Sequence, residues 1–265
     1  MPSFHDFARG LRQLGIERGL PVIAHASLSA FGQMTGGAET LVGALLASFS
    51  TVIMPAFTYL TMLTPESGPP GNGIAYGTGK DTNRMAEFYT PDLPADRTIG
   101  AVAEALRRHP KASRSTHPIL SFTGVNAASI LQAQTLSQPL EPIHALADAG
   151  GWVLLLGVDH TSNTSIHYAE RLAGRKQFVR WALTPEGIVA CPGWPGCSDG
   201  FQALAPHLEP VRRSVQVSSS LIQAFPLTAL VEAVTQAIAA DPFALLCHRT
   251  DCGRCNAVRE TPFTA

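Results

Sequence analysis

The sequence has no long apolar run and no excess of charge of one sign. It contains no stretch of about eighteen consecutive apolar residues, so we expect no membrane-spanning helix. The formal net charge is −1, and Lys and Arg form no long run. Proteins that bind the phosphate backbone of nucleic acids usually carry a basic stripe, so we expect no nucleic-acid partner.

The N-terminal segment also lacks the features of an export signal. A secretory signal has a continuous apolar stretch after a basic start, whereas this segment mixes polar and apolar residues from the outset (MPSFHDFARGLRQLG). We therefore expect a cytoplasmic protein whose five cysteines stay reduced and form no disulfide framework.

The residues that are present suit a globular fold. Hydrophobic residues make up 45% of the 265 and charged residues 15%, a balance that can bury a sizeable core. No internal repeat and no linker divides the chain. We therefore predict a single domain over residues 1–265, with a cysteine-bearing tail over 247–265.

Predicted helices and strands alternate along the chain. An amphipathic helix capped by Ser3 opens the sequence, and the Gly- and Pro-rich stretch 65–79 is expected to be a surface loop. Alternation of this kind predicts an α/β fold. The other expected elements are a strand at 22–24, a helix at 38–49, a strand at 51–57, a helix at 99–108, a buried strand at 152–158, a helix at 165–173, a hairpin over 178–191, a strand at 221–225 and a helix at 227–240.

The segment after the strand at 152–158 carries the first candidate chemistry. Asn163 or Thr164 is expected to cap the helix that follows, and His167 and Glu170 lie three residues apart on one helical face. Open α/β sheets bind ligands beyond the carboxyl ends of their strands. A histidine oriented there by a carboxylate would be a suitable general base, although the same spacing fits a solvated surface pair.

Two further loops combine small, hydroxyl and basic residues. Residues 25–29 (His-Ala-Ser-Leu-Ser) run towards Gly36 and Gly37 at the start of a predicted helix, where free N–H groups suit an anion. Arg114 stands beside Ser115 in a loop that ends at His117 and Pro118, and an arginine beside hydroxyl groups can hold a phosphate. Each loop is equally compatible with an ordinary connection between secondary-structure elements.

The C-terminal tail concentrates three cysteines. Cys247, Cys252 and Cys255 could supply three ligands of a tetrahedral zinc site, with His248, Cys191 or Cys197 as the fourth. Because no second Cys-x-x-Cys pair exists, the sequence favours reduced thiols without metal over structural zinc.

Several of these segments together resemble the aminoglycoside 3-N-acetyltransferase family. The resemblance rests on segments in the family's order and spacing between about residues 22 and 173. They are residues 25–32 (HASLSAFG) with 36–40 (GGAET), then 53–58 (IMPAFT), 114–118 (RSTHP), 154–158 (LLLGV) and 162–170 (SNTSIHYAE).

The resemblance implies a fold, a reaction and a set of site residues. It implies a three-layer α/β/α sandwich with a mixed central sheet, transfer of an acetyl group from acetyl-CoA to the 3-amine of a 2-deoxystreptamine antibiotic by direct attack, and no metal in catalysis. It assigns the catalytic histidine to His167 and a supporting carboxylate to Glu170. CoA is expected against His25, Ser27, Leu28, Ser29, Gly36, Gly37, Arg114, Ser115 and His117.

The acceptor side is expected to be acidic, because aminoglycosides are polycations. The candidate residues for acceptor binding are Tyr59, Asp81, Glu87, Asp159, Asn163 and Glu170. The sequence leaves the oligomer open between a monomer and a homodimer.

Three other functions remain open from the sequence. The first is a CoA-dependent acyltransferase acting on a non-antibiotic amine, and the second is a non-catalytic relative that binds drug or CoA. The third is a zinc hydrolase using Asp159, His160 and His167, which the lack of an H-E-x-x-H motif disfavours.

Overall fold

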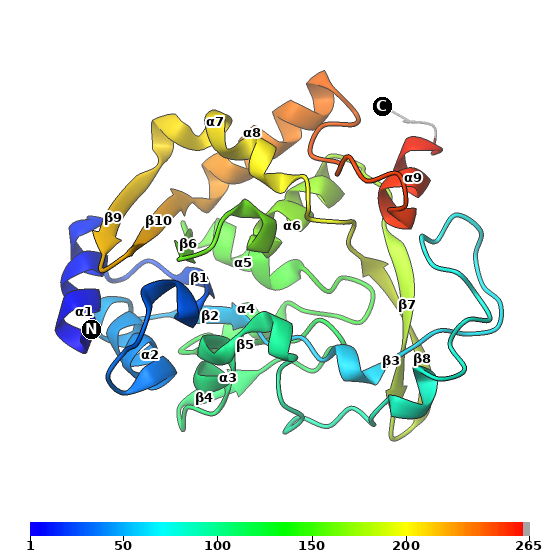
Figure 1. Cartoon of the computed structure of the whole chain (residues 1–265), viewed down its shortest axis with the longest axis horizontal. Helices are drawn as coiled ribbons and strands as arrows, with labels where there is room; N and C mark the ends of the chain where they lie inside the picture. The colour runs from blue at the N-terminus through cyan, green and yellow to red at the C-terminus, as the bar shows by residue number, and fades with distance from the viewer. Residues whose placement is uncertain (262–265) are drawn as a thin grey trace.

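A seven-stranded mixed sheet forms the centre of the molecule (Figure 1). The computed structural model, which describes residues 1–261, gives the strand order β4-β5-β2-β1-β6-β10-β9. β1 runs parallel to both β2 and β6, and the other neighbours pair antiparallel. The strands are β1 (Val22–Ala26), β2 (Val52–Pro55), β4 (Ala112–Arg114), β5 (Phe122–Val125), β6 (Trp152–Leu156), β9 (Arg213–Val217) and β10 (Ser220–Pro226).

Helices cover both faces of this sheet, which confirms the expected three layers. Successive strand residues point to opposite faces, so Val22 and Ala24 of β1 pack into one buried cluster and Ile23 into the other. The first layer contains α1 (Phe4–Gln13), α2 (Gly37–Ser48) and α3 (Ala101–Arg107). The second contains α4 (Ala128–Gln132), α5 (Glu141–Asp148), α6 (Thr164–Leu172) and α8 (Leu227–Ala240), with α7 (Ala205–Leu208) beside α8.

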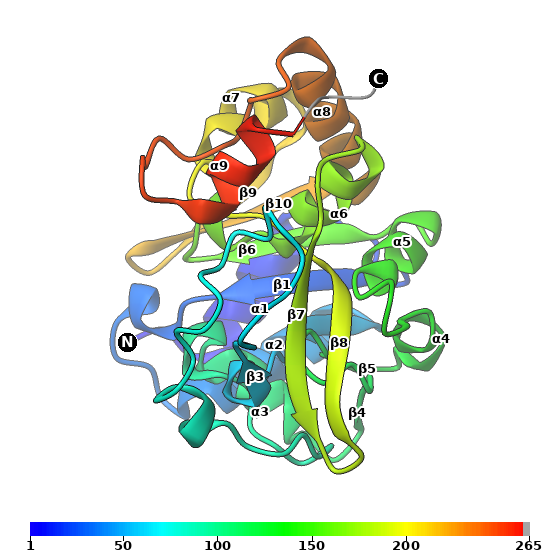
Figure 2. The same cartoon turned by 90° about the vertical axis from the view of Figure 1, so that its right-hand side faces the viewer.

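A second, three-stranded sheet extends from this core (Figure 2). It consists of β3 (Met62–Leu63), β7 (Phe178–Thr184) and β8 (Gly187–Trp194), so the hairpin expected over 178–191 is confirmed. Phe178, Ala182 and Trp194 belong to the same buried cluster as Ile53 and Leu155 of the central sheet. The two sheets therefore share one apolar cluster, and the single domain over 1–265 stays a prediction.

Short 3-10 turns and one further helix complete the chain. The turns are η1 (Leu28–Phe31), η2 (Tyr59–Thr61), η3 (Asn83–Met85), η4 (Arg97–Ile99), η5 (His160–Ser162), η6 (Phe201–Leu204) and η7 (Glu209–Val211). The helix α9 (Gly253–Arg259) lies with the three-stranded sheet on the side of the molecule opposite α1 (Figure 1). The last four residues of the tail predicted over 247–265 fall outside the described residues.

Local signals account for several element boundaries. Ser3 caps α1, where its backbone N–H donates to the Asp6 carboxylate at 3.0 Å and the Asp6 N–H donates back to the Ser3 hydroxyl at 3.4 Å. The expected loop at 65–79 has neither helix nor strand. Asn72 fastens it to β7, because its side chain donates to the Val179 carbonyl at 3.0 Å and accepts from the Val179 N–H at 2.8 Å.

No helix among residues 1–261 combines the length and the apolar character needed to cross a bilayer.

The turn that follows β6 requires a glycine. Gly157 has φ = +68°, and a Cβ built there would lie 2.6 Å from Ala30 Cβ and 2.9 Å from Ser220 Oγ. Both the backbone conformation and the close approach of the neighbouring loop therefore exclude a side chain at the strand end that leads to the site.

Gly157→Ala is expected to lower the free energy of unfolding by about 2–4 kcal/mol, from left-handed backbone strain plus overpacking. The matched control is Gly174→Ala, where φ is +76° but no heavy atom lies within 4 Å of the added Cβ. The control carries only the backbone strain, so we expect a loss of about 1 kcal/mol. Urea unfolding curves of both variants measure the difference, and equal losses would show that the contact with Ala30 is relieved at no cost.

Candidate active site

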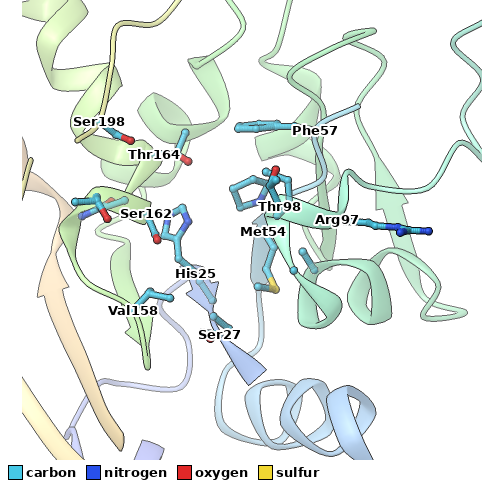
Figure 3. A pocket seen from close by; sticks show the side chains of 18 of the residues that line it. His25, Ser27, Met54, Phe57, Arg97, Thr98, Val158, Ser162, Thr164 and Ser198 are labelled. Atoms are coloured by element: carbon cyan, nitrogen blue, oxygen red, sulfur yellow. The ribbon is translucent and has the colours of Figure 1, made fainter. Parts of the chain in front are cut away.

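A cavity of about 900 Å³ opens beyond the carboxyl ends of the parallel strands β1, β2 and β6 (Figure 3). Residues 25–29, 54–59 and 158–164, at the end of each strand or just after it, contribute to its wall. Further parts of the wall come from 97–101, 194–196, Ser198 and Arg254, and the remaining lining residues are Ala24, Gly32, Ala103, Leu120 and His167. Because the carboxyl ends of parallel strands meet at one edge of a sheet, side chains that are distant in sequence converge here.

His167 reaches this cavity from the first turn of α6. Asn163 caps the helix, its side-chain oxygen accepting the Ser165 N–H at 3.1 Å, which confirms one of the two expected caps. The imidazole packs edge-on against the Phe201 ring, with centroids 4.7 Å apart, and the residue is 9% exposed. The cap sets where the helix starts, and the helix start sets where this histidine points.

A buried chain of charges supports His167 from behind. Its Nδ1 lies 2.8 Å from Glu170 Oε2, and the other oxygen of Glu170 accepts from Arg175 Nη1 at 2.6 Å. The side chains of Glu170 and Arg175 are each 1% exposed. Because a carboxylate only accepts hydrogen bonds, Nδ1 carries the proton, and Nε2 is left with a lone pair for the cavity.

Glu170 supports the histidine without lining the cavity. It sits behind Gly196, which does line the wall, and a Cβ built on Gly196 would lie 3.7 Å from Glu170 Oε2. The backbone at Gly196 therefore separates the Glu170 carboxylate from the cavity.

Two arginines give the cavity wall its formal charge. Arg97 and Arg254 line it, and no Asp or Glu appears in the wall formed by residues 1–261. Arg97 is exposed, whereas Arg254 is half-buried and donates to the Gly196 carbonyl at 2.7 Å. This charge distribution suits an anionic ligand such as a phosphate.

His25 lies on the floor of the cavity as a neutral ring. Burial lowers the pKa of His25 to about 3, so the imidazole is uncharged at neutral pH. Its Nε2 has no hydrogen-bond partner among the described residues. Next to it along the chain, the hydroxyls of Ser27 and Ser29 lie 3.1 Å apart. A neutral ring beside two hydroxyl groups offers polar contacts to an uncharged amide or ester group.

Aromatic residues form another part of the wall. The Tyr59 ring lies edge-on to Trp194 at 5.9 Å and 6.0 Å from Phe57. Burial raises the pKa of Tyr59 to about 12, helped by the nearby Asp96, so its phenol keeps its proton and can donate a hydrogen bond. Figure 3 shows Phe57 and Met54 across the cavity from Thr164 and Ser198.

The structure brings together about half of the residues predicted for the site. The predicted residues that line the cavity are His25, Ser27, Leu28, Ser29, Tyr59, Asn163 and His167, with Glu170 directly behind. The predicted residues that do not line it are Gly36, Gly37, Asp81, Glu87, Arg114, Ser115, His117 and Asp159.

Arg114 and its neighbours hold the loop in place instead of facing the cavity. The Arg114 guanidinium donates to the carbonyls of Ala56 at 2.7 Å and Pro91 at 3.0 Å, so its donors are already engaged. Ser115 accepts the Phe122 N–H at 2.8 Å. His117 Nδ1 accepts the N–H groups of the two residues at 119 and 120. Sequence spacing alone did not distinguish these internal contacts from phosphate contacts.

The predicted acidic residues lie on exposed loops. Asp81 and Glu87 are exposed, and the nearest basic partner of Asp81 is Arg84 at 3.8 Å. Asp159 caps η5 by accepting the Thr161 N–H at 2.9 Å. Gly36, with φ = +75°, and Gly37 serve as the turn into α2.

Several wall residues were not predicted as site residues. Arg97 follows an aperiodic loop, and Arg254 lies between two cysteines of the tail, so neither carries a sequence signal. Ser162 and Thr164 lie inside the segment that was singled out, beside Asn163. The unpredicted wall residues include Met54, Phe57, Arg97, Thr98, Ile99, Gly100, Ser162, Thr164, Trp194, Ser198 and Arg254.

Comparison with known proteins places the chain in a family. A family model described as aminoglycoside 3-N-acetyltransferase matches residues 23–239. The chain belongs to the aminoglycoside 3-N-acetyltransferase family. It is 36% identical over 184 residues to aminoglycoside N(3)-acetyltransferase VII of Streptomyces paromomycinus, which covers 65% of this chain and 62% of that protein. The chain therefore spans less than two thirds of that relative's length.

Other members of the family are similar over more of their length. Aminoglycoside N(3)-acetyltransferase III of a Salmonella species is 30% identical over 227 residues, covering 74% of this chain and 76% of that protein. Crystal structures of aminoglycoside acetyltransferase AAC(3)-IVa without ligand and of AAC-IIIb with CoASH share the fold, with TM-scores of 0.78 and 0.72 at 23% and 21% identity. They cover 97% and 90% of this chain, and 96% of each of those chains.

Two further buried histidines near the strand ends share the neutral state of His25. Burial lowers the pKa of His117 to about 4, and burial, partly offset by Asp159, lowers that of His160 to about 4. In the unfolded chain each ring takes up a proton near pH 6.5. Their contribution to stability is therefore complete above about pH 6.5 and is lost as the pH falls towards 4.

Each of the three buried histidines, His25, His117 and His160, is expected to lower the free energy of unfolding by about 1.4 kcal/mol for each pH unit as the pH falls from about 6 to 4.5. Urea midpoints measured across this range should show the combined slope. His117→Asn keeps a side-chain acceptor for the two loop amides and should remove about one third of the slope. His207→Asn, at an exposed histidine, serves as the control and should leave the slope unchanged. A flat profile in the parent protein would contradict neutral burial of these rings.

Proposed function

We propose that this protein transfers an acetyl group from acetyl-CoA to an amine of an aminoglycoside, with His167 as the general base and no metal in the reaction. The observation that carries the proposal is the buried His167–Glu170–Arg175 chain at the wall of a cavity of about 900 Å³. Membership of the family supports the same reaction class. Crystal structures of relatives in complex with CoASH and with apramycin support the choice of partners.

The reaction begins with removal of a proton. An ammonium group has no lone pair, so the acceptor must lose a proton before it attacks, and His167 Nε2 is positioned to take it. The ion pair with Glu170 stabilises the imidazolium that results. His167 passes this first proton to solvent and, as the amine nitrogen bonds to the thioester carbon, takes the second proton from that nitrogen. The carbon–sulfur bond then breaks, and CoA leaves as a thiolate that accepts the second proton from the imidazolium. The products are the amide, free CoA and one proton released to solvent.

Donors for the developing oxyanion are available from the segment that follows β6 and from the loop after β8. Ser162, Thr164 and Ser198 present hydroxyl groups on one side of the cavity (Figure 3), and His167 also lines this cavity. A hydroxyl aimed at the thioester oxygen would lower the energy of the tetrahedral intermediate.

CoA is proposed to lie along the segment 25–29, with an arginine near its phosphates. His25, Ser27 and Ser29 offer polar contacts to the pantetheine arm, and Arg97 offers a cation at the exposed edge of the cavity. All five cysteines are buried and none forms a disulfide, which is in keeping with a cytoplasmic setting.

His167→Ala is expected to lower kcat by about 10²–10⁴-fold, because the variant has no base at that position. The fold should persist, since the ring lies at a cavity wall and Glu170 retains Arg175. Acetyl transfer is followed as thiol release from acetyl-CoA, and folding is followed by thermal unfolding. His207→Ala is the matched control, an exposed histidine on α7 whose loss should leave kcat unchanged. Near-normal turnover by His167→Ala would remove the assigned role.

The acceptor class is tested with a panel of gentamicin, kanamycin, neomycin and apramycin. Thiol release that depends on the drug would support the proposal. Drug binding without thiol release would instead indicate a non-catalytic relative. Metal-dependent hydrolysis would support the zinc hydrolase that the sequence left open.

One observation favours a second candidate, an acyltransferase acting on a non-antibiotic amine that carries fewer positive charges than an aminoglycoside. The cavity wall formed by residues 1–261 carries two arginines and no carboxylate, which is an unfavourable surface for a polycation. This candidate predicts acetyl-CoA binding with no turnover of the four drugs and with turnover of monoamines. The same thiol assay with a set of monoamines separates the two.

A further inference from the structure

Four cysteines from three separate segments meet behind the cavity wall. Cys197 lies in the loop after β8, Cys247 follows α8, and Cys252 and Cys255 lie at the start of α9. All four are buried, and their sulfur atoms lie within 4.8 Å of one another. Fifty residues separate Cys197 from Cys247, so the sequence could offer Cys197 only as one of three candidates for the fourth ligand, beside His248 and Cys191.

Four converging sulfurs are the ligand set of a structural zinc site. In such sites Zn²⁺ is bound tetrahedrally with Zn–S distances of about 2.3 Å, which places the sulfurs about 3.8 Å apart. The observed limit of 4.8 Å needs only small side-chain adjustments to reach that geometry. The pair Cys252 and Cys255 has the Cys-x-x-Cys spacing that lets one turn supply two ligands.

Four buried sulfur atoms this close together suit a bound cation. Crowded thiolates repel one another, and a divalent cation replaces their protons and offsets that repulsion. None of the four cysteines is joined in a disulfide.

Two arginines lie beside the cluster. Zinc with four thiolates carries a formal charge of about −2. Arg259 donates to the carbonyl of Cys247, and Arg254 donates to the carbonyl of Gly196, next to Cys197. Arg249 is instead paired with Asp199 and Asp251. Arg254 and Arg259 therefore have the charge sign that a zinc–thiolate centre requires.

We propose that Cys197, Cys247, Cys252 and Cys255 bind one structural zinc ion that fastens the C-terminal segment to the loop after β8. The sequence favoured reduced thiols without metal, and the convergence of Cys197 with the other three reverses that preference. The ion does not touch the cavity and takes no part in acetyl transfer.

The proposed zinc ligands lie directly beside residues of the cavity wall. Cys197 stands between Gly196 and Ser198, which both line the cavity, and Arg254 lines it from between Cys252 and Cys255. A metal bound to these cysteines would therefore hold the loop after β8 and Arg254 in their positions in the cavity wall.

The first test is metal content, which does not depend on any activity. Protein grown with zinc and iron both supplied, and purified without chelators or a histidine tag, is analysed by plasma mass spectrometry. We expect about one zinc per chain in the parent protein, a loss of at least about tenfold in Cys197→Ser and Cys252→Ser, and full retention in Cys191→Ser. Cys191 is the matched control, a buried cysteine outside the cluster. Iron in place of zinc, or metal-free parent protein, would overturn the proposal.

The second test uses the parent protein alone, so it holds even if the variants fail to fold. Zinc is displaced with a mercurial reagent, the reagent is removed with excess thiol, and Co²⁺ is added. The absorption bands of tetrahedral cobalt–thiolate are expected, together with a rise in the thermal midpoint that Zn²⁺ also restores and Mg²⁺ does not. Cobalt spectra of octahedral oxygen ligation, or an unchanged midpoint, would refute the site whatever the outcome of the acetyl-transfer assays.

Discussion

The ion pair between Glu170 and Arg175 is the interaction on which the site depends. Both side chains are almost fully buried, and a lone charge in such a place would cost several kcal/mol. Each therefore requires the other. The second arm of the Arg175 guanidinium donates to the carbonyls of Pro242 at 2.9 Å and Ala244 at 2.8 Å. One arginine thus joins the end of α6, the carboxylate behind His167 and the chain that leads out of α8.

The group that orients His167 is buried, whereas the other side of the imidazole ring faces the cavity. The carboxylate that orients His167 is shielded from water by Gly196 and by the residues packed around Arg175. A shielded carboxylate holds one imidazole tautomer more firmly than a solvated one, because water does not compete for its oxygens. The cavity side of the ring remains open to ligand. The fold therefore fixes one ring nitrogen and leaves the other available.

Much of the fold followed from local patterns in the sequence. The Ser3 cap, the hairpin of β7 and β8, and α8 were predicted, because caps, turns and hydrophobic period act over a few residues. β9 was missed because its exposed Arg213, Ser214 and Gln216 give a short edge strand no apolar signal. The short helices α4 and α5 carry no long periodic run.

The site was predictable only in part, for a related reason. His167 and Glu170 share one helix, so their spacing was visible. Arg175 comes after the helix has ended and finds its partner through a turn, so no spacing rule reaches it. Cys197 and Arg254 meet the site through tertiary packing across the chain. Contacts of that kind depend on how layers stack, which local sequence does not specify.

The end of a chain is usually where a gene tolerates a premature stop or an in-frame extension. Arg254 makes this protein different, because the helix that carries it supplies part of the cavity wall. A stop codon shortly before residue 254 would remove a piece of the binding surface rather than a dispensable appendage. The cavity wall therefore extends into α9, and a reporter fused directly after α9 would sit within one short helix of the cavity.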